Sequence, residues 1–232
     1  FIPLSTLEAT LSLLPTPLIL PEHLSAAVAK RQRDYLAGRA CAQFLYAKYR
    51  VPWDGLLTYP DTHPQRGAPQ WPEGFVGSIS HSKDLAVACM YPGHEVRSVG
   101  LDTESIMSPA RAEQLRSQIL HPREDWVSSP LELTLVFSLK ESIYKALHPL
   151  LQRFIGFQEV WVQQPQCPTF AHSRFRTLRL SWRPEEQLAK DIKAHLGSLQ
   201  PPAFEGSTQW WVNTVGSAES EPTGFVLTHY SI

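Results

Sequence analysis

Val99-Gly100-Leu101-Asp102-Thr103-Glu104 reads as the end of a β-strand, where apolar residues give way to acids. Alternate residues of a strand point to one face, so we expect the Asp102 and Glu104 carboxylates to lie side by side. Adjacent carboxylates repel each other and raise each other's pKa, and a hard divalent cation such as Mg²⁺ relieves that repulsion. The alternative is a pair of solvent-exposed acids, a common surface feature.

The stretch 130–150 is typical of a largely buried helix, because apolar residues cover most of its circumference. Its polar residues nevertheless fall in one narrow stripe, formed by Thr134, Ser138, Glu141, Lys145 and His148. Such a stripe predicts that this side of the helix lines a cleft. Two simpler interpretations stay open: Glu141 and Lys145 form a surface ion pair, or Ser138 and Glu141 form a helix-capping box.

Two further segments are candidate anion sites. Gly77-Ser78-Ile79-Ser80-His81-Ser82 combines a glycine, which permits close approach of a ligand, with hydroxyls and an imidazole that can donate to phosphate oxygens. The stretch 30–50 holds a basic cluster against the single acid Asp34, consisting of Lys30, Arg31, Arg33, Arg39, Lys48 and Arg50. The competing interpretations are a structural histidine and a solvated helix face.

The rest of the chain predicts a mixture of helices and strands. We expect helices over 24–50, 109–119 and 130–150, and a loop rich in Pro and Gly over 51–74. Short strands are expected at 75–81, 84–91 and 96–102, joined as an antiparallel meander. Later strands are expected at 156–163, 174–183, 208–214 and 224–231. The fold class is therefore α+β, either as a single unit or as two α+β lobes that join near residues 100–110.

Composition excludes several classes of protein. The charge is close to neutral, with 21 Lys+Arg against 22 Asp+Glu, which argues against a nucleic-acid partner or a polybasic membrane binder. Three separated cysteines without a C-x-x-C pair argue against a zinc ribbon or disulfide scaffold and favour a reducing, cytoplasmic compartment. No apolar run is long enough for a membrane span. Because the chain begins at Phe1 rather than Met, we expect an N-terminal piece to precede it.

Together these motifs predict phosphoryl-group transfer, with carboxylates for a metal, donors for phosphate and a cationic patch. The pair Val99-Gly100-Leu101-Asp102-Thr103-Glu104 and Phe137-Ser138-Leu139-Lys140-Glu141-Ser142-Ile143-Tyr144-Lys145 resembles the two-part signature of the 4′-phosphopantetheinyl transferases. Trp71-Pro72, Gly77–Ser82 and the stretch 30–39 are similar to the larger, two-lobed branch of that family, the surfactin and enterobactin-synthase type. The resemblance covers about residues 28–160.

This resemblance implies two similar lobes related by a pseudo-twofold axis, which we place at 1–105 and 106–232, with coenzyme A in the cleft between them. It implies that Asp102, Glu104 and Glu141 bind Mg²⁺. The groups implied to contact coenzyme A are Lys30, Arg33, Arg39, Arg66, Ser80, His81 and Lys145. Ala68 stands where many members carry a phosphate-binding lysine, and Arg66 is the expected substitute.

The implied reaction transfers 4′-phosphopantetheine from coenzyme A to a serine of an apo acyl or peptidyl carrier protein and releases 3′,5′-ADP. His81 and Lys145 would stabilise phosphate oxygens, and Glu141 would accept the serine proton or serve only as a metal ligand. The protein is expected to be a monomer that serves siderophore, polyketide or fatty-acid synthesis. Alternatives are another Mg²⁺-dependent phosphoryl or nucleotidyl transferase, and an inactive coenzyme A-binding module. The absence of G-x-x-x-x-G-K-[ST] argues against a P-loop enzyme.

The carrier is expected to dock on segment 109–126, which combines arginines with apolar residues: Arg111, Arg116, Arg123, Leu115, Ile119, Leu120 and Trp126. The equally weighted alternative is that its apolar residues pack on the helix at 130–150.

Overall fold

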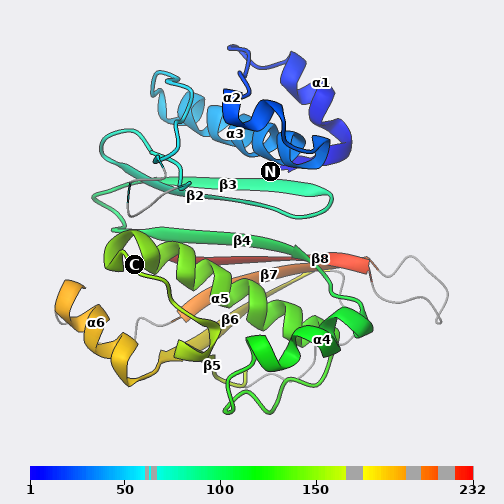
Figure 1. Ribbon diagram of the computed structural model, residues 1–232, viewed down its shortest axis with the longest axis vertical. Helices are drawn as coiled ribbons and strands as arrows, with labels where there is room; N and C mark the ends of the chain where they lie inside the picture. The colour runs from blue at the N-terminus through cyan, green and yellow to red at the C-terminus, as the bar shows by residue number, and fades with distance from the viewer. Residues whose placement is uncertain (61–62, 64–66, 166–174, 197–204, 214–222, 232) are drawn as a thin grey trace.

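The computed structural model describes residues 1–60, 63, 67–165, 175–196, 205–213 and 223–231. It is a mixed α and β protein with two antiparallel sheets (Figure 1). The three-stranded sheet has the order β1-β3-β2, with bounds Ile2–Pro3, Leu85–Pro92 and Phe75–His81. The five-stranded sheet has the order β4-β8-β7-β6-β5, with bounds Val99–Ser105, Thr223–Ser231, Glu205–Asn213, Phe175–Pro184 and Val160–Val162.

Two long helices cover these sheets. Helix α3 (Ala29–Tyr49) packs on β2 and β3, and helix α5 (Pro130–Leu151) packs on β4 and β8 (Figure 1). The shorter helices are α1 (Leu7–Ser12), α2 (Glu22–Ser25), α4 (Pro109–Ile119) and α6 (Glu186–Leu196), with 3₁₀ turns η1 (Leu4–Thr6) and η2 (Phe157–Glu159). The expected helices over 24–50, 109–119 and 130–150 are confirmed, apart from a break at 26–28.

Local sequence explains the limits of α5. Ser129 accepts a hydrogen bond from the Glu132 amide while the Glu132 carboxylate accepts from the Ser129 amide, which is a capping box. Pro130 occupies the first helical position, where its missing N–H has no cost, and Gln152 ends the helix with a φ of 51°. The capping box considered at Ser138 and Glu141 is therefore wrong, because both residues lie inside the helix.

The expected meander is correct for its first two strands and wrong for the third. β2 and β3 pair antiparallel, but β4 pairs with β8 in the other sheet. β1 pairs with the Leu85–Ala86 end of the second edge of β3, with Ile2 opposite Ala86. The pairing of β4 with β8 instead extends along the whole of β4, from Val99 to Ser105.

The two sheets meet where β2 lies beside β4, and side-chain hydroxyls join them. The Leu101 amide donates to Ser78 Oγ at 3.0 Å, and the Thr103 amide donates to Ser80 Oγ at 3.3 Å. Both serines are buried. The hydroxyls thus satisfy two strand amides that would otherwise lack partners.

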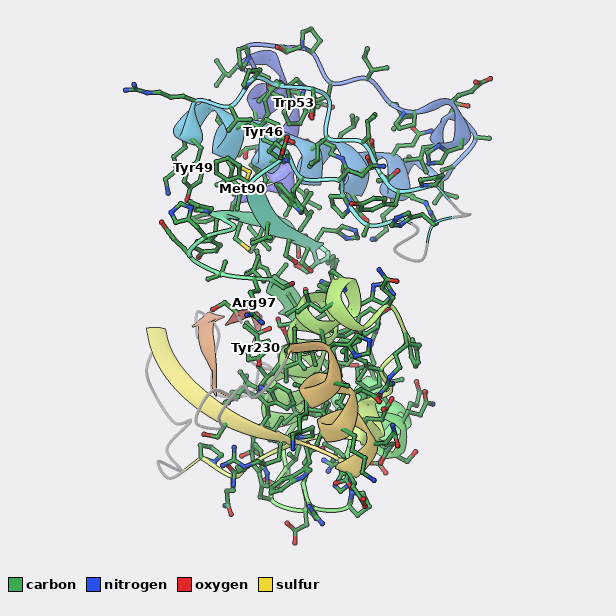
Figure 2. The ribbon with its side chains drawn as sticks, turned by 90° about the vertical axis from the view of Figure 1, so that its left-hand side faces the viewer. Tyr46, Tyr49, Trp53, Met90, Arg97 and Tyr230 are labelled. Carbon is green, nitrogen blue, oxygen red and sulfur yellow. The ribbon has the colours of Figure 1, made fainter. Side chains whose placement is uncertain are left out.

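Each half of the chain has its own apolar interior. Figure 2 shows Tyr46, Trp53 and Met90 among the N-terminal elements, Tyr230 among the C-terminal ones, and Arg97 between them. The Tyr46 and Trp53 rings meet edge to face at 4.9 Å. The larger cluster forms between α5 and the five-stranded sheet, where Trp182 contacts Tyr230. Helix α6 was not predicted from the sequence, and it adds Leu188 and Ile192 to this cluster.

Gly100 is required for the contact between β4 and α5. A Cβ atom at this position would collide with the Ser142 carbonyl and would lie 2.8 Å from the Ala146 amide, both backbone groups of α5. We expect Gly100→Ala to lower the free energy of unfolding by about 3 kcal/mol, because a packed helix has to move. Urea denaturation measures this value. Gly156→Ala is the matched control, since the nearest atoms there are 3.9 Å away, and a loss as small as that of the control would contradict the prediction.

Candidate active site

Lys145 lies at the point where α5, β2 and β4 come together. Its Nζ donates to Asp102 Oδ1 at 2.7 Å, to Ser80 Oγ at 3.0 Å and to the Leu101 carbonyl at 3.1 Å. Ser80 Oγ also donates to Asp102 Oδ1 at 2.8 Å. Three predicted site residues from three elements are therefore in direct contact.

The surface ion pair considered between Glu141 and Lys145 is wrong, because the ammonium of Lys145 binds Asp102 instead. The polar stripe on α5 also serves two purposes. Ser138 is fully buried and bonds the Thr228 hydroxyl at 2.9 Å, which attaches α5 to β8. Lys145 and His148, nearer the end of the helix, line a cavity.

The three predicted metal-binding acids influence one another electrostatically. Burial, and then the charge of Asp102, raises the pKa of Glu104 to about 7. The same two causes raise the pKa of Glu141, while the Lys145 ammonium opposes the rise in both residues. Glu104 and Glu141 therefore resist ionisation, because water is partly excluded from them and because the Asp102 carboxylate is near.

The three acids have the donor chemistry of a divalent-cation site. Asp102 Oδ2 is buried and has no hydrogen-bond partner among the described residues, so it has an unused electron-pair donor. Carboxylate oxygens are the ligands that Mg²⁺ prefers, and a dication would lower the mutual repulsion of the acids. The donor chemistry therefore fits. In the described part of the chain, no group of three or more His, Cys, Asp or Glu side chains is already positioned to hold a metal ion.

His81 belongs to a cavity of about 520 Å³ between α3 and the end of β2, which we call the cationic cavity. Its basic lining residues are His23, Lys30, Arg31, Arg39 and His81. Asp34 lies among them, with Oδ2 2.6 Å from Lys30 Nζ and 3.7 Å from His81 Nδ1. Partial burial lowers the pKa of His81, although its side chain is still 46% exposed, so the imidazole is mainly neutral at pH 7 before any anion binds.

The basic cluster predicted on α3 separates into different environments. Lys30 is exposed at the cavity wall, whereas Arg39 is buried, donates to the Leu56 carbonyl at 3.1 Å and lies over the Tyr35 ring. Arg39 therefore supports the loop after α3 as well as the cavity. Arg33 is exposed and is not among the cavity-lining residues. Arg66 lies outside the described residues.

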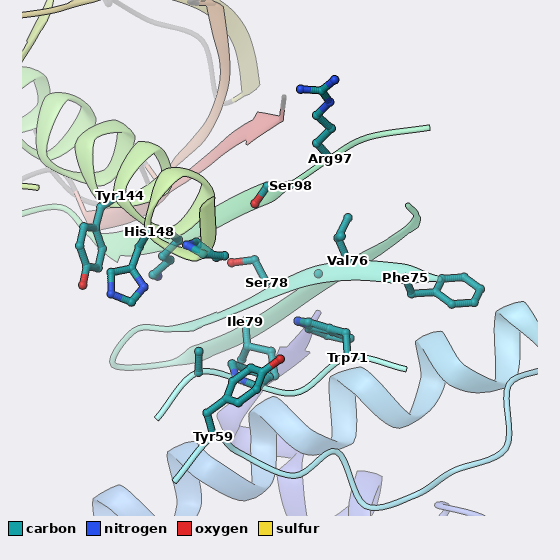
Figure 3. Close-up of a pocket in the computed structure, with 15 residues that line it drawn as sticks. Tyr59, Trp71, Phe75, Val76, Ser78, Ile79, Arg97, Ser98, Tyr144 and His148 are labelled. Atoms are coloured by element: carbon teal, nitrogen blue, oxygen red, sulfur yellow. The ribbon is translucent and has the colours of Figure 1, made fainter. Parts of the chain in front are cut away.

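A second cavity of about 410 Å³ adjoins the first, with Ile79 and Pro69 in both walls. We call it the aromatic cavity. Figure 3 shows Tyr144 and His148 projecting from α5 toward β2, with Trp71 and Tyr59 contributed by the segment opposite. Ala68, at the position of the expected lysine, is part of its wall. Lys145 lines this cavity too, so the Lys145 cluster borders it.

Gly77 explains how Trp71 reaches this wall. A Cβ on Gly77 would lie 2.5 Å from the Trp71 ring and 2.6 Å from the Cys89 carbonyl. The glycine in Gly77–Ser82 thus admits an indole rather than a ligand backbone. Sequence reasoning missed this use, although both residues belong to matched motifs.

Lys140, the other lysine of the motif, has a structural position. It is buried, and its Nζ donates to Glu124 Oε2 at 2.7 Å and to the carbonyls of Ile119 and Phe157. Glu124 Oε1 accepts in turn from the Val162 amide. This network joins α5 to the chain on either side of it. Lys140 and Lys145 have opposite environments despite their common motif.

The structure favours the packing interpretation of segment 109–126. Leu115, Ile119, Leu120 and Trp126 all belong to the apolar cluster around α5 or pack against it. Arg116 donates to the Val127 carbonyl at 2.7 Å. Arg111 is exposed and close enough to Glu104 to lower its pKa. The apolar half of the expected docking surface is therefore unavailable, and Arg111 remains at the border of the acid cluster.

Two family models match this chain. The 4′-phosphopantetheinyl transferase N-terminal domain matches residues 20–90, and the 4′-phosphopantetheinyl transferase superfamily matches residues 98–196. The chain belongs to the 4′-phosphopantetheinyl transferase superfamily.

Several characterised proteins are similar to it. It is 36% identical to 4′-phosphopantetheinyl transferase Npt of Nocardia iowensis over 146 residues, which are 61% of this chain and 63% of that protein. It is 39% identical to enterobactin synthase component D of Salmonella typhimurium over 135 residues, 55% of this chain and 53% of that one. For enterobactin synthase component D of Escherichia coli K12, identity is 30% over 185 residues, 74% and 81% of the two chains. The chain thus spans less than two thirds of the length of the first two.

Proposed function

We propose that this protein transfers the 4′-phosphopantetheine group of coenzyme A to a serine of an apo acyl or peptidyl carrier protein, releasing 3′,5′-ADP. The observation that carries the proposal is the Lys145–Asp102–Ser80 cluster, with Glu104 and Glu141 nearby and a cationic cavity alongside. Family membership supports it, as do the names of the relatives. Their enterobactin-synthase names make a siderophore-type carrier the first to test.

In this proposal the cationic cavity binds the nucleotide phosphates. Lys30 and His81 donate to phosphate oxygens at its wall, and Lys145 Nζ exchanges one of its three present hydrogen bonds for one to the transferred phosphate. Asp102, Glu104 and Glu141 would hold Mg²⁺, which neutralises charge on the phosphates when it is bound. Glu141 either completes the metal site or accepts the proton of the attacking serine; its raised pKa in the metal-free protein suits the second role, and a carboxylate that binds Mg²⁺ is a poorer base.

We further propose the two-lobe arrangement with a pseudo-twofold axis, divided in the connection between β3 and β4 rather than at the expected residues 105 and 106. It is supported by two similar units, each a long helix packed on an antiparallel sheet, that meet at β2 and β4. β4 itself is hydrogen-bonded in the five-stranded sheet, so it belongs with the C-terminal unit by its pairing.

The carrier protein is proposed to dock beside Arg111, where a cation borders the acid cluster and can attract an acidic partner. A cytoplasmic location is proposed because Cys41 and Cys89, the described cysteines, are free thiols. Among the described helices, none is long and apolar enough to cross a membrane. The monomeric state stays a prediction.

Incubation of the protein with coenzyme A, Mg²⁺ and an apo carrier, followed by intact mass spectrometry of the carrier, tests the function directly. A carrier heavier by one phosphopantetheine group is the expected result. Transfer of another fragment would support the alternative of a different phosphoryl or nucleotidyl transferase. Coenzyme A binding without any transfer to a panel of carriers would support an inactive binding module.

Lys30 is expected to distinguish coenzyme A from dephospho-coenzyme A. Its ammonium is exposed at the wall of the cationic cavity, where it can meet the additional 3′-phosphate. A charge-assisted hydrogen bond contributes about 1.5–3 kcal/mol, so Lys30→Ala should weaken coenzyme A binding roughly 10-fold or more. Calorimetry should show little change for dephospho-coenzyme A. Lys48→Ala, near the far end of the same helix, is the control. Equal losses for both ligands would show that Lys30 does not bind the 3′-phosphate.

A further inference from the structure

Asp34 is an acid inside a cavity that is otherwise cationic. Its side chain is only 5% exposed and lines the wall shared by Lys30, Arg39 and His81. Oδ2 contacts Lys30 at 2.6 Å, whereas Oδ1 is buried and has no hydrogen-bond partner among the described residues. A buried carboxylate oxygen without a partner is costly, so its position requires an explanation.

The ion pair with Lys30 does not explain why Asp34 is in this cavity. The Lys30 side chain is 61% exposed, and an i,i+4 pair on a helix contributes only a few tenths of a kcal/mol when a partner is in water. A negative charge in this place also repels the phosphates that the cavity is proposed to bind. The position of Asp34 would be explained if its carboxylate orients or stabilises a neighbouring side chain that binds the phosphate.

His81 is that neighbour, on the strand that faces α3. Burial and the ammonium groups of Lys30 and Lys145 oppose a positive charge on its imidazole, while Asp34 and Asp102 favour one. Of the two acids, Asp34 has the larger effect and the closer measured contact, 3.7 Å from Oδ2 to Nδ1. That distance is too long for a hydrogen bond, but both atoms border the same cavity.

We infer that Asp34 is a positioning residue that holds the Nδ1 side of His81, so that Nε2 is the nitrogen that meets a substrate phosphate. The carboxylate selects the neutral tautomer with hydrogen on Nδ1, which leaves the Nε2 lone pair free to take up a proton from solvent. It also stabilises the resulting imidazolium, whose Nε2–H donates to the bound phosphate. Asp34 Oδ1, which has no hydrogen-bond partner among the described residues, is the carboxylate oxygen left to accept from Nδ1–H. This inference rests on the proposed binding of coenzyme A phosphates in the cationic cavity.

Asp34→Asn separates this positioning role from simple charge repulsion, because the two predict opposite changes in the affinity for phosphate. Removing a negative charge from an anion site should tighten phosphate binding if the charge acts only through repulsion. Loss of positioning should instead weaken the binding of 3′,5′-ADP about 10-fold, as expected for one misplaced charge-assisted hydrogen bond. Calorimetry on the full chain measures the dissociation constant. Asp84→Asn, an exposed acid in the turn between β2 and β3, should leave it unchanged.

A double-mutant cycle identifies the residue through which Asp34 acts. In a His81→Ala background, Asp34→Asn should lose most of its effect on 3′,5′-ADP, because the group that it positions is gone. In wild-type protein, ¹⁵N NMR of His81 should show hydrogen on Nδ1 in the neutral form, a result that does not depend on the stability of any variant. In Asp34→Asn, His81 should become protonated only at a lower pH.

Tighter or unchanged binding in Asp34→Asn, or hydrogen on Nε2 of the wild-type imidazole, would overturn the inference and leave the proposed function intact. Failure of wild-type protein to bind either 3′,5′-ADP or coenzyme A would overturn the proposed function together with the inference.

Discussion

Asp102→Asn is expected to reduce kcat/KM for transfer to a carrier by about 10³-fold or more. The substitution keeps the size of the side chain and removes the charge that would hold Mg²⁺, a loss of several kcal/mol of transition-state stabilisation. It also weakens the hydrogen bonds from Ser80 Oγ and Lys145 Nζ to Oδ1. A single-turnover assay with coenzyme A and an apo carrier measures the change.

Asp125→Asn, an exposed acid, is the control for this measurement. Thermal unfolding has to accompany the assay, because a buried residue with two partners also contributes to stability. Glu104→Gln and Glu141→Gln test the other proposed ligands and should abolish most transfer as well. Wild-type turnover in any two of the three variants at ordinary Mg²⁺ concentrations would show that these acids do not form the metal site.

Lys145→Met is expected to lower kcat/KM by about 10²–10³-fold, because it removes a cation proposed to stabilise the transferred phosphate. The structure adds a second, opposite effect. The ammonium is 2.7 Å from Asp102 Oδ1, so it competes with a metal ion for that carboxylate oxygen and its positive charge repels a dication. In the absence of coenzyme A, the affinity for Mg²⁺ should therefore rise in the variant.

Calorimetric titration with Mg²⁺ and the transfer assay together test this pair of effects. Lys83→Met, which removes an exposed lysine in the turn after β2, should change neither quantity. Lower Mg²⁺ affinity in Lys145→Met would contradict the competition between lysine and metal. Unchanged transfer would remove Lys145 from the proposed mechanism.

The main elements of the site could be predicted from sequence because their residues are close along the chain. Alternation along 99–104 placed Asp102 and Glu104 on one face, and helical spacing in 130–150 placed Lys145 on a polar stripe. The partner of Lys145 could not be predicted in this way. Asp102 lies 43 residues away on β4, and only the packing of α5 on that strand brings the two together.

The position of β4 could not be predicted for a related reason. Short connections between 75 and 102 favour a meander, but pairing depends on which edges are free. β4 pairs with β8, at Thr223–Ser231, and nothing in the local pattern of 96–102 reveals so distant a partner. Helix α6 could have been predicted from the sequence, because Leu188, Ile192 and Leu196 recur every fourth residue and give one apolar face.

The packing of segment 109–126 illustrates an ambiguity of amphipathic patterns. An apolar face beside arginines fits a partner surface and an interior surface equally well, and the contact with α5 decides for the interior. The same holds for the two lysines of the α5 motif. Lys140 and Lys145 are five residues apart, yet only the tertiary structure shows that one binds Glu124 in the interior and the other borders a cavity.

The contacts among Ser80, Asp102 and Lys145 also constrain how this protein can change over generations. These side chains form the proposed site, and their hydrogen bonds also hold α5, β2 and β4 together. A substitution that frees one of them for a new ligand loosens the junction of the two sheets. A new substrate specificity is therefore more accessible through substitutions in the walls of the aromatic cavity, such as at Tyr59 or His148. These residues take no part in the hydrogen bonds among Ser80, Asp102 and Lys145.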